Sequence, residues 1–156
     1  MVAHVVNSVA FFAAVYDPSA SNLWTAYKGK GALLNGEKLS VKRESTQKII
    51  LKVSDLWKDE SILRKISSGL VGYEVEYSTY SCAVNHGLVA SGQYDGVIDL
   101  AKDSFPEFAG GLIVREAGGQ FTNIEGHSEI QPSDRIFIGG NPETYPKLFS
   151  LVKGAL

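Results

Sequence analysis

The sequence is poor in the residues that build disulfides and cysteine-rich metal sites. It has a single cysteine, Cys82, among 156 residues, so an intramolecular disulfide and a Cys-rich zinc site are both excluded. The three histidines, His4, His86 and His127, lie far apart in the sequence and show no metal-ligand spacing. We therefore interpret the histidines as structural or surface residues, and Cys82 as a small buried residue.

Strong charge and long hydrophobic runs are also missing. The formal net charge is −2 and the isoelectric point about 5.9, so no bulk attraction to nucleic acid is expected. The apolar stretch within residues 1–18 is short, follows no basic segment and leads directly into a turn, which favours a buried strand over a signal peptide or a membrane span. A soluble cytoplasmic protein, with neither nucleic acid nor membrane as a partner, is the expectation.

The overall composition is that of a folded protein of modest size. Hydrophobic residues make up 44% of the sequence and charged residues 21%, which is too apolar for a disordered chain. A mass of 16.9 kDa is ordinary for one domain. We therefore predict a single domain over residues 1–156.

The first third of the chain has the patterns of strands. Residues 5–16 are apolar and rich in Val and Phe, which predicts one strand buried on both faces. After a break at residues 17–19, further strands are expected at 22–27, 32–34 and 47–53. The Asn35-Gly36 pair after the second of these is a strong signal for a two-residue hairpin turn.

Helix signals follow in the rest of the chain. Apolar residues at helical spacing (Leu56, Leu63, Ile66 and Leu70) predict a first helix, with Ser54 as its N-cap. A stripe of small residues predicts a second helix over residues 81–91, ended by Gly92. Ser104-Phe105-Pro106-Glu107 has the pattern of a capping box at the start of a third helix. Asn141-Pro142 marks the start of the last.

Strands alternate with these helices. They are expected at residues 73–77, 96–100 and 135–138. The predicted fold class is therefore α/β, with a mixed β-sheet flanked by helices.

Four segments resemble the inositol monophosphatase family, in the family's order and at its spacing. They are VYDP with LWTAYKGKGALLNGEKL, SCAVNHGLVASGQYDGVID, GGLIVREAGGQFTN and the closing IFIGGNPETYPKL. The match spans almost the whole chain. The resemblance implies the C-terminal portion of the family's αβαβα sandwich, with the N-terminal metal-binding half absent.

The resemblance also implies a magnesium-dependent phosphatase that hydrolyses a sugar or inositol phosphate. Two or three Mg²⁺ ions polarise the phosphate monoester in this family, and hard cations require Asp and Glu oxygens. Two of the family's carboxylate sources precede the point where this chain starts. In the third motif, Phe105 takes the Trp position and Pro106 the position of the metal-binding Asp. We therefore do not expect the chain alone to assemble the Mg²⁺ centre, and no residue is assigned a catalytic role.

Two carboxylates beside the altered motif remain as candidate metal ligands, Asp103 and Glu107. A solvated turn acid is the alternative interpretation for Asp103. For Glu107 the favoured interpretation is the capping-box partner of Ser104.

The candidate substrate-binding residues are Ser81, Cys82, Ala83 and Asp99, at positions where the resemblance implies contact with the sugar. Backbone N–H groups at a helix N-terminus attract anions whatever the side chains are. Tyr80 replaces a small residue of the family, and its ring is expected to occupy part of the pocket. Asp99 is alternatively an exposed acid at the end of a strand.

Two functions of different class stay open. The chain is either the sugar-binding half of a phosphatase, active with a partner that carries the missing ligands, or a non-catalytic binding or scaffolding domain derived from one. Pro106 favours the second, because a merely truncated enzyme should retain Asp there. In both cases apolar residues of the first strands would face water, which predicts a homodimer or an N-terminal-half partner.

Overall fold

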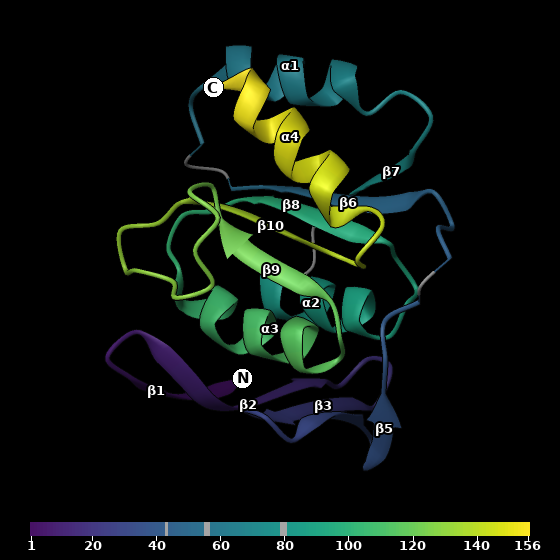
Figure 1. Ribbon diagram of the computed structural model, residues 1–156, viewed down its shortest axis with the longest axis vertical. Helices are drawn as coiled ribbons and strands as arrows, with labels where there is room; N and C mark the ends of the chain where they lie inside the picture. The colour runs from purple at the N-terminus through teal and green to yellow at the C-terminus, as the bar shows by residue number, and fades with distance from the viewer. Residues whose placement is uncertain (43, 55–56, 79–80) are drawn as a thin grey trace.

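The computed structural model describes residues 1–42, 44–54, 57–78 and 81–156, and its elements stack in four layers (Figure 1). Helices α1 (Glu60–Gly69) and α4 (Tyr145–Ala155) form the first layer, followed by a mixed sheet. Helices α2 (Cys82–Ala90) and α3 (Phe105–Glu116) lie between this sheet and a second, antiparallel one. The predicted α/β class with helices flanking a sheet is confirmed, but there are two sheets and not one.

The antiparallel sheet is built from the first forty residues in chain order. Its strands are β1 (Val2–Val6), β2 (Val9–Asp17), β3 (Asn22–Tyr27), β4 (Gly31–Leu34) and β5 (Glu37–Leu39). The predicted single strand over 5–16 is wrong, because Asn7 and Ser8 adopt positive φ angles and form a tight turn between β1 and β2. The Asn35-Gly36 turn is confirmed, with φ angles of 52° and 86°.

The mixed sheet has the strand order β7-β6-β8-β10-β9. Its bounds are β6 (Lys48–Val53), β7 (Glu74–Tyr77), β8 (Gly96–Leu100), β9 (Gln120–Asn123) and β10 (Ile136–Gly140). Strand β6 pairs in parallel with β7 and β8, while β10 is antiparallel to β8 and β9. Strand β8 is therefore central, and all five of its residues are buried.

Helices α2, α3 and α4 lie where the sequence predicts them, whereas α1 begins later. The carboxylate of Asp59 caps α1 by accepting from the backbone N–H groups of Ser61 and Ile62. The predicted N-cap, Ser54, is wrong: its N–H donates to the carbonyl of Leu100 at 2.8 Å, so the chain is still bound to β8 there. Leu56 lies outside the described residues. Among the helices that the structure describes, none has the length and apolar character that a membrane span requires.

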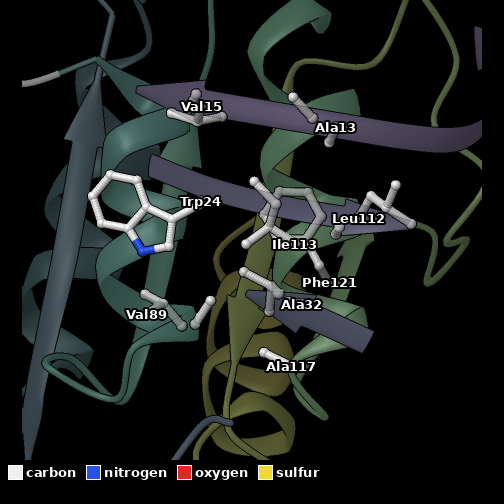
Figure 2. Packing of buried hydrophobic residues seen from close by; sticks show 14 of the residues in the cluster. Ala13, Val15, Trp24, Ala32, Val89, Leu112, Ile113, Ala117 and Phe121 are labelled. Atoms are coloured by element: carbon white, nitrogen blue, oxygen red, sulfur yellow. The ribbon is translucent and has the colours of Figure 1, made fainter. Parts of the chain in front are cut away.

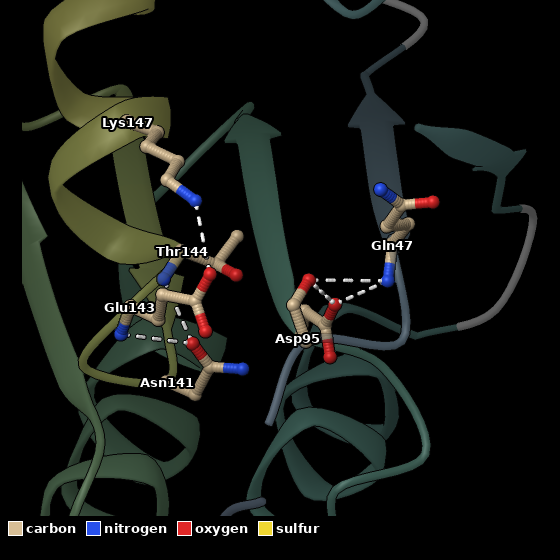
Figure 3. A network of polar contacts seen from close by, with 7 residues as sticks. Gln47, Asp95, Asn141, Glu143, Thr144 and Lys147 are labelled. Carbon is tan, nitrogen blue, oxygen red and sulfur yellow. Dashed lines mark hydrogen bonds and ion pairs between the residues drawn. The ribbon is translucent and has the colours of Figure 1, made fainter. Parts of the chain in front are cut away.

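Two polar turns fix the start of β8 and of α4 (Figure 3). Asp95 precedes β8 and accepts hydrogen bonds from Ser45, Thr46 and the backbone N–H of Gln47. The side chain of Asn141 accepts from the N–H groups of the two residues before α4, the second at 2.8 Å. The bonds from the backbone N–H groups satisfy donors that have no partner in a sheet or a helix.

The core between the sheets includes Trp24, which is fully buried (Figure 2). Its indole lies against α2 because position 87 is glycine: a Cβ there would approach the ring carbons to 2.6 Å. The indole N–H donates to the hydroxyl of Ser91 at 2.9 Å, so the polar edge of the ring is satisfied. Trp24 thereby joins β3 to the C-terminal end of α2.

The opposite face of the antiparallel sheet carries apolar side chains with no described element on top of them. Strand residues alternate between the two faces, so neighbours of the buried Val15 and Trp24 point outward. Tyr16 and Tyr27 are each 54% exposed. Phe11 is 45% exposed because it lies at the bulge where the register of β1 and β2 shifts. The predicted exposure of apolar residues on the first strands is confirmed.

Candidate functional site

A cavity of about 210 Å³ opens where β6 and β8 end and where α2 and α3 begin. The carboxyl ends of parallel strands and the N-termini of the following helices meet at one edge of such a sheet, which is the usual position of a ligand site. The walls come from three separate stretches of the chain: Lys52, Val53 and Ser54; Cys82; and Asp99, Ala101, Lys102, Asp103 and Pro106.

Three potential ligand groups converge at the inner end of this cavity. The Sγ of Cys82, a carboxylate oxygen of Asp99 and a carboxylate oxygen of Glu107 all lie within 4.8 Å of one another. Both carboxylates are fully buried, and none of their oxygens has a hydrogen-bond partner in the described part of the chain. Buried polar groups are nearly always paired, so these unpaired oxygens require an explanation.

A buried histidine stands beside this group. The Nε2 of His86 lies 3.6 Å from an oxygen of Asp99, and the His86 side chain is 0% exposed. The ring packs edge-on against Phe121 with a centroid distance of 4.8 Å. A Cβ at Gly110 would overlap the imidazole, so the glycine of α3 creates the space that His86 of α2 occupies.

The location of Asp99 follows from the period of strand β8. Val97 packs in the core shared with α2 and α3, and Asp99, two residues later, faces the same side. On its own sheet Asp99 lies opposite Lys52 of β6 and Phe137 of β10. A carboxylate is thus fixed on the central strand, directly beneath the first turns of the two helices.

Burial sets the protonation of the cluster. Burial first, and the charge of Asp99 second, raise the pKa of Glu107 to about 9. Burial also raises the pKa of the Cys82 thiol far above its usual range, with further contributions from Asp99 and Glu107. At neutral pH, and with no cation present, Glu107 is therefore a neutral acid and Cys82 a thiol.

The structure separates the four predicted substrate-binding residues. Cys82 and Asp99 line the cavity. Ser81 is the exposed N-cap of α2, and Ala83 is fully buried in the core, so its methyl group faces away from solvent. Asp99 is buried, so its interpretation as an exposed strand-end acid is wrong. The assignment to substrate stays a prediction, and Tyr80 lies outside the described residues.

The two predicted metal ligands also lie in different places. Asp103 lies in the wall of the cavity, and its carboxylate accepts the N–H of Phe105 at 3.2 Å. Glu107 points inward to Asp99 and Cys82. The capping-box interpretation of Glu107 is wrong, because neither Ser104 nor Glu107 makes the bonds that define it among the described residues. The first turn of α3 directs Glu107 into the core, and Asp103 supplies an N-terminal acceptor instead.

Sequence reasoning missed the place of His86 in the site, and that of Lys52 and Lys102. One signal for His86 was available: Cys82 and His86 are four residues apart on one helix, which places them on the same face. The two lysines carry no motif. They join the site only because β6 and β8 are paired and the chain turns back after β8.

Comparison with known proteins identifies relatives of the whole chain. The sequence model of the inositol monophosphatase family matches residues 1–155. The Nus factor SuhB of Escherichia coli K12 is 30% identical over 155 residues, covering 92% of this chain and 55% of that protein. The inositol-1-monophosphatase of Bacillus subtilis is 28% identical over 142 residues, covering 86% of this chain and 52% of that protein.

The fold agrees with these relatives. The solved IMPase of Thermotoga maritima superposes with a TM-score of 0.81 at 24% identity, covering 98% of this chain and 59% of that one. The chain spans about half the length of the curated relatives it matches.

Proposed function

The chain belongs to the inositol monophosphatase family, and from this premise we propose that its cavity binds a phosphorylated sugar or inositol without hydrolysing it unaided. The family is in general magnesium-dependent. Mg²⁺ takes oxygen ligands, whereas the groups that converge in this chain are a mixed set of two carboxylates and one sulfur, which suits softer ions. Pro106 offers no side-chain ligand, and the groups that converge include the sulfur of Cys82.

The observation that carries the proposal is the combination of two carboxylates, Asp99 and Asp103, and two ammonium groups in a single cavity. Asp99 lies in its wall together with Lys52 and Lys102. Ammonium groups attract a phosphate monoester, and the N-termini of α2 and α3 add backbone N–H groups directed toward the same space. A carboxylate accepts hydrogen bonds from sugar hydroxyls. The cavity therefore offers complementary groups to both ends of a phosphorylated polyol.

Binding of inositol monophosphate, measured by calorimetry in the presence of EDTA, tests this proposal. We expect saturable binding that weakens about tenfold in Lys52→Gln and in Lys102→Gln, because each loses a charged hydrogen-bond donor. Lys38→Gln is the matched control, because Lys38 lies exposed on β5, in the other sheet. Equal affinity in all four proteins, or no binding to the unsubstituted chain, would contradict the proposal.

We further propose that hydrolysis requires a polypeptide that supplies the family's N-terminal half, docked on the outer face of the antiparallel sheet. Two facts support this occupant: the chain spans about half of its relatives' length, and this face exposes Phe11, Tyr16 and Tyr27. A non-catalytic binding or scaffolding domain is the second candidate function, and Pro106 favours it.

Light scattering distinguishes these possibilities. The probe is the N-terminal half of the Bacillus subtilis relative, mixed with this chain. We expect a heterodimer that Tyr27→Lys weakens. Self-association of this chain, weakened by the same substitution, would replace the proposed occupant with a second copy. A monomer under both conditions would contradict any partner on this face.

A further inference from the structure

We propose that Cys82, Asp99 and Glu107 bind one divalent transition-metal ion of the zinc class at the inner end of the cavity. Their three ligand atoms lie within 4.8 Å of one another. A tetrahedral ion with ligands at about 2.0–2.3 Å separates its ligand atoms by roughly 3.5 Å. The three groups therefore need to approach by at most about 1.3 Å, which side-chain rotation can supply.

The unpaired oxygens of Asp99 and Glu107 point independently to a cation. Both side chains are 0% exposed, and the described residues offer no hydrogen bond to any of their four oxygens. Two carboxylates and a thiolate that face one another repel when all three are ionised. A divalent cation between them would satisfy all three groups at once.

The donor set selects the kind of metal. A thiolate with two carboxylates is a mixed sulfur and oxygen set, which suits Zn²⁺ and similar ions better than Mg²⁺. Cys82 and Asp99 line the cavity, so an ion bound there has a path from solvent. The three protein ligands leave a fourth tetrahedral position toward that cavity, as in zinc sites that keep one position open.

His86 has the position of a supporting residue. Its Nε2 lies 3.6 Å from Asp99, and its ring is held by Phe121 and by the space at Gly110. Carboxylate ligands are commonly oriented by such outer contacts. Neither ring nitrogen of His86 has a hydrogen-bond partner among the described residues, so a shift of Nε2 to hydrogen-bond distance would let His86 orient the Asp99 carboxylate without touching the metal.

Cobalt spectroscopy tests the site with no phosphorylated ligand present. Co²⁺ titrated into the folded chain should give a near-ultraviolet thiolate band that saturates at one equivalent and that Zn²⁺ removes. Cys82→Ser should abolish the band, and the chain has no other cysteine that could replace it. Asp99→Asn and Glu107→Gln should each weaken Co²⁺ binding about tenfold or more. Asp103→Asn is the control, because this carboxylate lies in the same cavity but outside the cluster.

Several results would overturn the inference. The absence of a thiolate band in the unsubstituted chain would do so. A Co²⁺ affinity that is unchanged in Asp99→Asn and Glu107→Gln would also do so, because the cysteine would then bind the ion without the carboxylates. Circular dichroism of each variant separates lost binding from lost folding. Asp99 takes part in both proposals, but their tests are separate, because inositol monophosphate binding is measured in EDTA and cobalt binding without that ligand.

Discussion

The imidazole of His86 and the carboxylate of Asp99 lie side by side inside the protein, with Nε2 and Oδ2 3.6 Å apart and both side chains excluded from solvent. The pair joins α2 to the central strand at the inner end of the cavity. It exists because α3 passes His86 at a glycine, Gly110, so that three elements meet without a side chain between them.

Gly110→Ala tests this packing. The new Cβ would overlap the His86 ring, and both residues are buried, so we expect a loss of about 1–3 kcal/mol in the free energy of unfolding. Gly154→Ala is the control, because a Cβ at that position in α4 meets no atom within 4 Å. There we expect no loss, and a gain of up to about 1 kcal/mol from helix propensity. Urea unfolding of both variants measures the difference; equal stability would contradict the packing described.

Glu116→Ala tests the attachment of α3 to the antiparallel sheet. The Glu116 carboxylate accepts from the N–H of Gly29 at 2.7 Å and of Gly31 at 2.8 Å. Gly29 lies in the turn before β4 and Gly31 is the first residue of β4; both adopt positive φ angles, which brings their N–H groups to one acceptor. We expect a loss of about 1–3 kcal/mol in the unfolding free energy. Glu37→Ala, on the exposed strand β5, should change it by less than about 0.5 kcal/mol. A Glu116 variant no less stable than the Glu37 variant would show that the turn is held by other contacts.

Asp95 predicts how stability depends on pH in acid. Burial acts to raise its pKa, but hydrogen bonds from Thr46, Ser45 and Gln47 outweigh burial, so the pKa lies below its ordinary value of 3.8. An acid with a lowered folded pKa stabilises the fold fully above its ordinary pKa and loses that contribution as pH falls through the folded value. Stability should therefore decline below about pH 4.

Asp95→Asn should be less stable at pH 7 by about 1–3 kcal/mol, and the difference from the parent should shrink toward pH 2. Unfolding curves at several pH values measure this. The surface substitution Glu129→Gln serves as control, since Glu129 is exposed. If the difference in unfolding free energy between Asp95→Asn and the parent stays constant from pH 7 to pH 2, the hydrogen bonds do not depend on the charge of Asp95.

Much of the fold follows from local signals in the sequence. The Asn35-Gly36 turn is predictable because few residue pairs accept two positive φ angles. The small residues of α2 predict that helix, and Asn141-Pro142 predicts the turn that leads into α4, although the N-cap of α4 is Thr144 and not Asn141. The β1–β2 turn is not predictable in this way. Asn7 and Ser8 interrupt the apolar run for only two residues, so the sequence pattern predicts one continuous strand.

The site is less predictable than the fold. The family resemblance indicates positions 82 and 99, and the structure brings both to one cavity. The pattern Ser104-x-x-Glu107 is compatible with a cap or with an inward side chain, and only the tertiary packing of α3 decides between them. Lys52 and Lys102 reach the same cavity only because β6 pairs with β8, and the local sequence around each lysine does not indicate this pairing.

The most direct test of the central claim is phosphate release by the purified chain on inositol monophosphate, with and without Mg²⁺, beside the calorimetric binding measurement. We predict saturable binding and no magnesium-dependent release, because Pro106 cannot ligate the ion and the converging groups include the sulfur of Cys82. Magnesium-dependent turnover by the chain alone would contradict it, and would mean that these residues or a second copy rebuild the family's metal centre.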